Sequence, residues 1–141
     1  MNHARQAMDR YISGFCAHDM DMVLSAFSPT AVGISPEGPA EGHEEFASHI
    51  ALFWQSFPDA HMASWESVDA GDTTVDEVSI TGTHTGDPWL VAGVDVPPTG
   101  RAVQLRGCYV CTAEYGYIVS LRLYYDQLEL LAQLGRLSDT V

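Results

Sequence analysis

The spacing of apolar residues changes once along this chain, near Pro58, and that change limits the folds available to it. Before Pro58, apolar residues recur every three or four positions, as on amphipathic helices. After Pro58, long stretches rich in Thr, Val and Ile are typical of β-strands. Helices followed by a run of strands predict an α+β fold, in which a curved antiparallel sheet wraps around the N-terminal helices.

Turn residues divide this pattern into elements. A short helix is expected after a cap at Asp19 or Asp21 and before Pro29. The last helix is expected over 126–134, with Gly135 as its stop signal. The other expected helices cover 3–17 and the segment after Gly42 that ends at Pro58, the expected strands cover 31–35, 61–69, 73–85, 101–113 and 117–125, and loops are expected over 36–42 and 86–100.

Length and composition indicate one domain, residues 1–141, with 46% hydrophobic residues to supply its core. No apolar run is long enough to span a membrane. The first residues, MNHARQAMDR, are polar and contain no apolar core of a signal peptide. We therefore expect a cytoplasmic protein.

The charge is strongly negative: six basic residues face 19 acidic ones, for a net charge of −13. Nucleic acid and anionic lipid would repel such a chain, so neither is expected as a partner. An acidic surface also serves solubility alone. All six basic residues are Arg, which excludes a Schiff base on a lysine of this chain.

Metal and cofactor motifs are missing from the sequence. Cys108 and Cys111 form a C-x-x-C pattern, but in an expected strand two residues three apart point to opposite faces and cannot share one ion. His43 and His49 are six apart, without chelating spacing, and no dinucleotide-binding or phosphate-binding loop is present. The sequence predicts cofactor-free chemistry without a metal.

Asp126 is the leading candidate for a catalytic group, because it stands where the last strand ends and the last helix begins. A carboxylate held there above an apolar cavity could act as a general base. A structural alternative exists. With Glu129 three residues later, Asp126 also forms a D-x-x-E pattern that is close to a helix capping box.

Alternation along the last strand places Arg122, Tyr124 and Asp126 on one face. Such a polar face either meets solvent or lines a ligand pocket on the concave side of the sheet. In the second case, Tyr124 would lie about 6.6 Å and Arg122 about 13 Å along the strand from Asp126. Tyr124 could then orient a substrate, and Arg122 could hold a carboxylate or an enolate.

His84 is the second catalytic candidate, at the end of the expected strand 73–85. It could protonate a carbonyl oxygen or stabilise its anion. Its alternative is a structural histidine satisfied by the neighbouring threonines. An aromatic cavity for a flat substrate could be lined by Trp54, Trp65, Trp89, Phe53 and Tyr11, although core packing is the favoured explanation for Phe53 and Trp54.

Four segments together resemble a known family: FPDAH at 57–61, TGTHTG at 81–86, PPTGR at 97–101 and DQLELLAQLG at 126–135. The chain resembles the SnoaL-like polyketide cyclases, a branch of the NTF2-like superfamily that includes ketosteroid isomerases and limonene epoxide hydrolases. The resemblance implies a cone-shaped fold, a catalytic aspartate at Asp126, and a homodimer joined through its outer sheet faces.

The functional hypothesis is an aldol-type ring closure of a small hydrophobic or polyketide-like substrate. Asp126 would remove a proton from a carbon flanked by carbonyls, and His84 or Tyr124 would assist at the second carbonyl. Two alternatives remain open. One is other chemistry in the same cavity, such as epoxide opening or isomerisation. The other is a small-molecule binding protein without catalysis.

Overall fold

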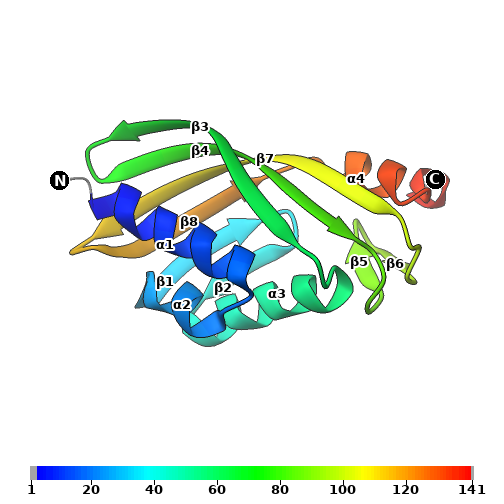
Figure 1. Cartoon of the computed structure of the whole chain (residues 1–141), viewed down its shortest axis with the longest axis horizontal. Coiled ribbons are helices and arrows are strands. Elements are labelled where there is room, and N and C mark those ends of the chain that lie inside the picture. The colour runs from blue at the N-terminus through cyan, green and yellow to red at the C-terminus, as the bar shows by residue number, and fades with distance from the viewer. Residues whose placement is uncertain (1–2, 141) are drawn as a thin grey trace.

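The computed structural model describes residues 3–140 and has the α+β architecture that the sequence predicts (Figure 1). Its helices are α1 (His3–Ala17), α2 (Met20–Ser25), α3 (Gly42–Ser56), α4 (Gln127–Gln133) and the short 3₁₀ helix η1 (Leu137–Thr140). Its strands are β1 (Phe27–Ser35), β2 (Gly38–Glu41), β3 (His61–Ala70), β4 (Thr73–Thr83), β5 (Trp89–Val91), β6 (Val94–Val96), β7 (Ala102–Glu114) and β8 (Tyr117–Tyr124).

Six strands form one bent sheet in the order β2-β1-β8-β7-β4-β3, and β5 and β6 pair separately. Figure 1 shows α1, α2 and α3 on the side toward which the sheet bends, with α4 and the β5–β6 hairpin at the far end of the long strands. One pairing differs from the expected antiparallel run: β1 lies parallel to β8. The chain must cross from one strand to the other through the rest of the domain, so no local turn could reveal this pairing.

Strand β2 and the β5–β6 hairpin lie where the sequence predicts loops. Ser35 pairs with Gly38 across a tight turn, which Gly38 permits with its φ of 120°. The β5–β6 hairpin turns at Ala92 and Gly93, both with positive φ. Positive φ at both central residues is the geometry of a type I′ hairpin turn, and Ala is a poor signal for it, which is why this hairpin was missed.

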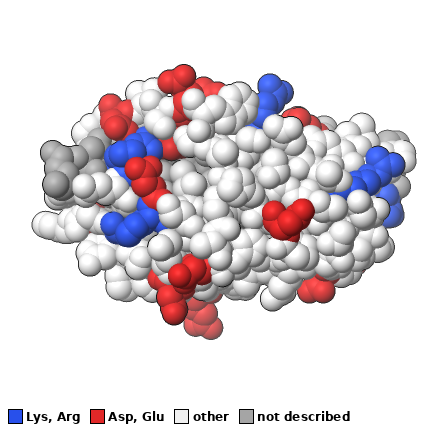
Figure 2. All heavy atoms as spheres, viewed as in Figure 1, with Lys and Arg blue, Asp and Glu red and all other residues white. Residues whose placement is uncertain are grey.

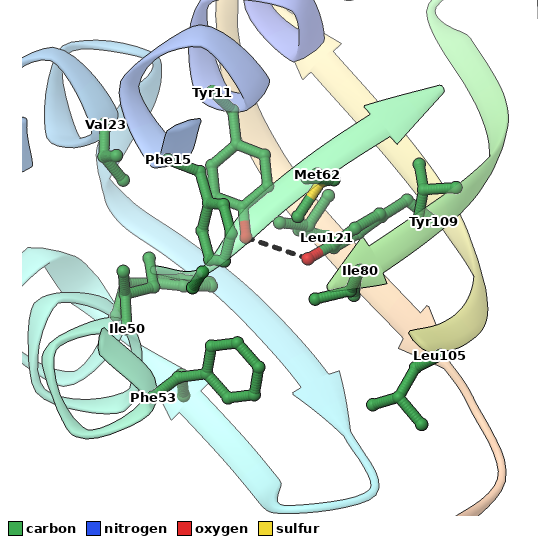
Figure 3. Packing of buried hydrophobic residues seen from close by; sticks show 14 of the residues in the cluster. Tyr11, Phe15, Val23, Ile50, Phe53, Met62, Ile80, Leu105, Tyr109 and Leu121 are labelled. Atoms are coloured by element: carbon green, nitrogen blue, oxygen red, sulfur yellow. Dashed lines mark hydrogen bonds between the residues drawn. The ribbon is translucent and has the colours of Figure 1, made fainter. Parts of the chain in front are cut away.

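One hydrophobic core fills the space between the helices and the concave face of the sheet. Helix α1 contributes Ala7, Met8, Tyr11 and Phe15, and the sheet contributes alternate residues of β4, β7 and β8. Figure 3 shows side chains of α1, α3 and the sheet converging on one point, where the Tyr11 and Tyr109 hydroxyls meet. The site described below lies beside this point.

The charged side chains lie mostly at the margins of the face shown in Figure 2, and uncharged atoms cover much of its centre. Among residues 3–140, no helix is both long and apolar enough to cross a membrane.

Candidate functional site

A cavity of about 100 Å³ lies between α1, α3 and the concave face of the sheet. Its wall is almost entirely apolar. The aromatic and aliphatic residues that line it are Phe15, Ile34, Ala40, Phe46, Ile50, Phe53, Ile80, Leu105, Leu121 and Leu123. An engineered apolar cavity of about 150 Å³ binds benzene, so a space of this order suits a single ring or an equivalent group.

Two tyrosine hydroxyls provide the polar contact deep in this cavity. Tyr11 on α1 and Tyr109 on β7 are both buried, and their oxygens lie 2.9 Å apart (Figure 3). Since one hydroxyl donates to the other, the pair retains one O–H proton for a third group. Burial raises the pKa of Tyr11 to about 12 and the pKa of Tyr109 well above its usual value. Both side chains are therefore neutral donors at physiological pH.

Glu37 and His49 mark the entrance of the cavity. They line the inner cavity and also a wider outer groove of about 370 Å³, and no other residue within 3–140 lines both. Glu37 lies in the turn between β1 and β2, and His49 is a half-buried residue of α3. The walls of the groove come from the β5–β6 hairpin, α3 and the residues around Pro88. Ligand pockets commonly measure about 300–1,000 Å³, so cavity and groove together reach that range.

The Glu37 carboxylate is also close to a third tyrosine, Tyr125, which lines the cavity directly after β8. Burial and then the negative charge of Glu37 raise the pKa of Tyr125. The same charge contributes to the raised pKa values of Tyr11 and Tyr109. Ser35 donates a hydrogen bond of 2.8 Å to Glu37 Oε2, which holds the side chain at the turn. One carboxylate and three phenols thus share this site.

Asp126 does not line the cavity, which corrects the position expected from the sequence. It is the N-cap of α4: its Oδ1 accepts hydrogen bonds from the backbone N–H of Leu128 at 2.9 Å and of Glu129 at 3.3 Å. The residue is exposed to solvent. The structure therefore shows the capping role that the sequence left as the alternative.

Arg122 and Tyr124 lie on the convex face of the sheet, the opposite face to the one expected for pocket residues. Tyr124 pairs with Cys108 of β7 and is 55% exposed, whereas its neighbour Leu123 lines the cavity. Alternation along β8 was predicted correctly, but the wrong set of residues was assigned to the pocket. A period of two defines two faces without saying which one is concave.

His84 is fully buried outside the cavity and is held as a structural residue. Its Nδ1 accepts from the backbone N–H of Thr99 at 3.3 Å, and its Nε2 lies 3.1 Å from the carbonyl oxygen of Asp87. The ring stacks on Phe57 at a centroid distance of 5.0 Å. Both ring nitrogens are thereby used to fix the loop after β4, which corrects the expected catalytic position.

The five aromatic candidates fall into four places. Trp65 on β3 is 56% exposed and lines neither the cavity nor the groove, which corrects its expected position. Tyr11 and Phe53 line the inner cavity, and Trp89 lines the outer groove. Trp54 lines neither of them. Its ring stacks on that of His18 at a centroid distance of 4.8 Å and lies 5.9 Å from that of Phe15, against the hydrophobic core. For Trp54, the expected contact with substrate is therefore corrected in favour of packing.

Sequence reasoning missed Glu37, His49, Tyr109 and Tyr125. Tyr109 and Tyr125 carried a signal, since each shares a strand face with apolar residues two positions away, and that face meets the core. Glu37 and His49 carried none, because a glutamate in a Pro-Glu-Gly turn and a histidine on a helix are ordinary surface residues. Within residues 3–140, no group of three or more His, Cys, Asp or Glu side chains is arranged to hold a metal ion.

The sequence pattern of the SnoaL-like polyketide cyclases matches residues 5–134. This chain belongs to the SnoaL-like polyketide cyclase family. None of the curated proteins matches the sequence. Solved structures with the same fold as this SnoaL-like chain are numerous.

Three of these structures illustrate the likeness. IdmH from Streptomyces antibioticus is 24% identical, with 94% of this chain and 98% of that chain covered and a TM-score of 0.78. A protein with a ketosteroid isomerase-like fold from Catenulispora acidiphila, in complex with trimethylamine, is 16% identical, with coverages of 94% and 95% and a TM-score of 0.77. TerC, co-crystallised with polyporic acid, is 16% identical, with coverages of 95% and 99% and a TM-score of 0.77. At these identities the likeness shows the fold, which is NTF2-like.

Proposed function

We propose that this SnoaL-like protein is a cofactor-free cyclase that closes a ring in a polyketide-like substrate, with one carbonyl oxygen of the substrate held by the Tyr11–Tyr109 pair. The observation that carries the proposal is a buried pair of neutral hydroxyls in an otherwise apolar cavity. A flat, ring-bearing ligand would bury its apolar surface there, and its carbonyl would accept the remaining O–H proton.

The tyrosine pair would contribute to catalysis because charge develops on that oxygen. When a proton leaves the neighbouring carbon, the carbonyl oxygen becomes an enolate oxygen and accepts a stronger hydrogen bond. Donors already in place inside a water-poor cavity stabilise this charge without reorganisation. A tyrosine hydroxyl performs this task in ketosteroid isomerase, the general example of such chemistry. Among the solved structures of this fold, TerC was crystallised with polyporic acid, a small molecule.

A binding experiment tests this arrangement with 2-naphthol, a flat two-ring phenol whose oxygen resembles that of an enolate. Tyr109→Phe removes one hydroxyl and should weaken 2-naphthol binding about 3- to 10-fold in isothermal titration calorimetry, the loss of about one hydrogen bond. Tyr115→Phe is the matched control, because Tyr115 is fully exposed at the β7–β8 turn and should leave the affinity unchanged. Absence of 2-naphthol binding by the wild-type protein, or equal affinities for all three, would contradict the proposal.

A second candidate function is ligand binding without catalysis. It is favoured by one observation: the deep part of the cavity holds hydroxyls but no carboxylate or imidazole, since Glu37 and His49 stand at the entrance. The two functions are distinguished by the proton-exchange experiment described in the next subsection.

We also propose that two copies associate through the convex face of the sheet. Two large apolar side chains of β3, Trp65 and Val68, are 56% and 57% exposed on this face. Trp65 stands at a bulge of β3 and lines an open hollow together with Thr81, Gln104, Arg106 and Gln133. An aromatic anchor surrounded by polar groups is the composition of many protein interfaces.

Trp65→Glu should convert the dimer into a monomer, because a charge at the centre of the contact would be buried without a partner. Size-exclusion chromatography with light scattering measures the mass directly. Met22→Glu places the same charge on an exposed apolar residue of α2, away from the sheet. This variant should still have the mass of the dimer. A monomeric wild-type protein would contradict this proposal.

A further inference from the structure

We infer that Glu37, in the β1–β2 turn, is the general base of this site and that it removes a proton from the substrate carbon beside the carbonyl held by the tyrosine pair. This inference rests on the proposed function. The sequence favoured Asp126 near the C-terminus as the base. The structure points instead to Glu37, in the N-terminal third of the chain.

Among residues 3–140, Glu37 is the only carboxylate that lines the inner cavity, and it also lines the outer groove. A ligand that extends from the groove into the cavity must therefore pass this side chain. The carbon next to the anchored carbonyl would lie between the deep hydroxyls and the entrance, where a base is required.

The negative charge of Glu37 contributes to the raised pKa values of Tyr11, Tyr109 and Tyr125, so the carboxylate acts on all three phenols. In the part of the chain that the structure describes, no other carboxylate contributes in this way. Phenols that stay neutral beside it remain hydrogen-bond donors, and Glu37 is the acceptor for a proton. Base and oxyanion donors are thus different groups that line one cavity.

The reaction balances without any co-reactant. Glu37 takes the proton, and the electrons of the broken C–H bond form an enolate whose oxygen is held by Tyr11 and Tyr109. The enolate carbon then bonds to the carbon of a second carbonyl in the same substrate, and the electrons of that carbonyl move to its oxygen. This alkoxide recovers the proton from Glu37. The product has the same atoms as the substrate and one new carbon–carbon bond.

The test follows the first step with 2-tetralone, a flat bicyclic ketone, as the probe. In D₂O the wild-type protein should exchange the protons beside the carbonyl faster than buffer does, with saturation, as followed by proton NMR. Glu37→Gln should reduce this enhancement by about 10²-fold or more, because general base catalysis typically contributes 10²–10⁴-fold. Glu37→Asp, which keeps the carboxylate but shortens the side chain, should retain part of the activity.

Two further measurements separate the possible outcomes. Glu66→Gln removes the same charge from an exposed residue of β3 outside cavity and groove, and should exchange 2-tetralone at the wild-type rate. Glu37→Gln should still bind 2-naphthol, because the tyrosine pair is intact. Binding of 2-naphthol without enhanced exchange by the wild type, or equal exchange by wild type and Glu37→Gln, would overturn the role of Glu37 and leave the proposed binding mode standing. Failure of the wild type to bind 2-naphthol would overturn the proposed function itself.

Discussion

Arg5→Ala should destabilise the protein by about 3–5 kcal/mol, because it leaves a buried carboxylate without its cation. Asp76 on β4 is 1% exposed, and its Oδ2 lies 2.8 Å from Nη1 of Arg5 on α1. Ser64, Ser67 and Thr74 also donate hydrogen bonds to Asp76. The hydroxyls cannot replace the lost positive charge. Urea denaturation measures the change as a lower midpoint at unchanged slope.

Two variants in the same cluster control this result. Asp9 also lies near Arg5, at 3.5 Å, but it is exposed, and Asp9→Ala should leave the midpoint unchanged within error. The double variant Arg5→Met with Asp76→Leu removes both charges and should lose less stability than Arg5→Ala alone, since no unpaired charge remains buried. An Arg5→Ala protein as stable as the wild type would show that this ion pair does not fasten α1 to the sheet.

Alkaline pH should weaken the fold strongly between about pH 10 and pH 12. An unfolded tyrosine has a pKa of about 10. In the folded protein, burial raises the pKa of Tyr11 to about 12 and raises the pKa values of Tyr109 and Tyr125. A raised pKa in the folded state means that the unfolded chain loses its proton first. The stabilisation is complete below pH 10 and is lost as the pH rises through the folded-state pKa.

The expected loss in the free energy of unfolding is about 1.4 kcal/mol per buried tyrosine for each pH unit above 10. Tyr11 alone therefore accounts for a loss of about 3 kcal/mol by pH 12. Free energies of unfolding measured in urea at several pH values test the slope. Absorbance of the phenolates offers a second reading, because the buried Tyr11, Tyr109 and Tyr125 should ionise only well above pH 10. Tyr115→Phe should keep the full pH dependence of stability. Ionisation of Tyr11, Tyr109 and Tyr125 near pH 10 in the folded protein would contradict the burial of the site.

The proposed mechanism and these stability predictions depend on the same three phenols. They are neutral because they are buried, and a neutral phenol is a hydrogen-bond donor for a developing oxyanion. The hydrogen-bond donors of the proposed site are therefore side chains of the hydrophobic core.

Local sequence determined the four α-helices, the five longer strands and several of their ends. Asp19 caps α2 and Asp126 caps α4, as expected for aspartates that precede apolar helical segments. The β7–β8 hairpin closes at Tyr115 and Gly116, as the sequence predicts near Gly116. These features depend on residues a few positions apart, so they are visible in the chain before it folds. The motifs at 57–61, 81–86, 97–101 and 126–135 also sufficed to predict the family.

Tertiary structure alone decided the composition of the site. The face of β8 that meets the helices follows from how the whole sheet packs on α1 and α3, including the parallel pairing of β8 with β1, which no local turn encodes. This choice turned Leu123 and Tyr125 inward and left Arg122 and Tyr124 outside. Glu37 reached the cavity only because β1 and β2 bring their turn to its entrance. Periodicity tells which residues share a face, but long-range packing determines what that face meets.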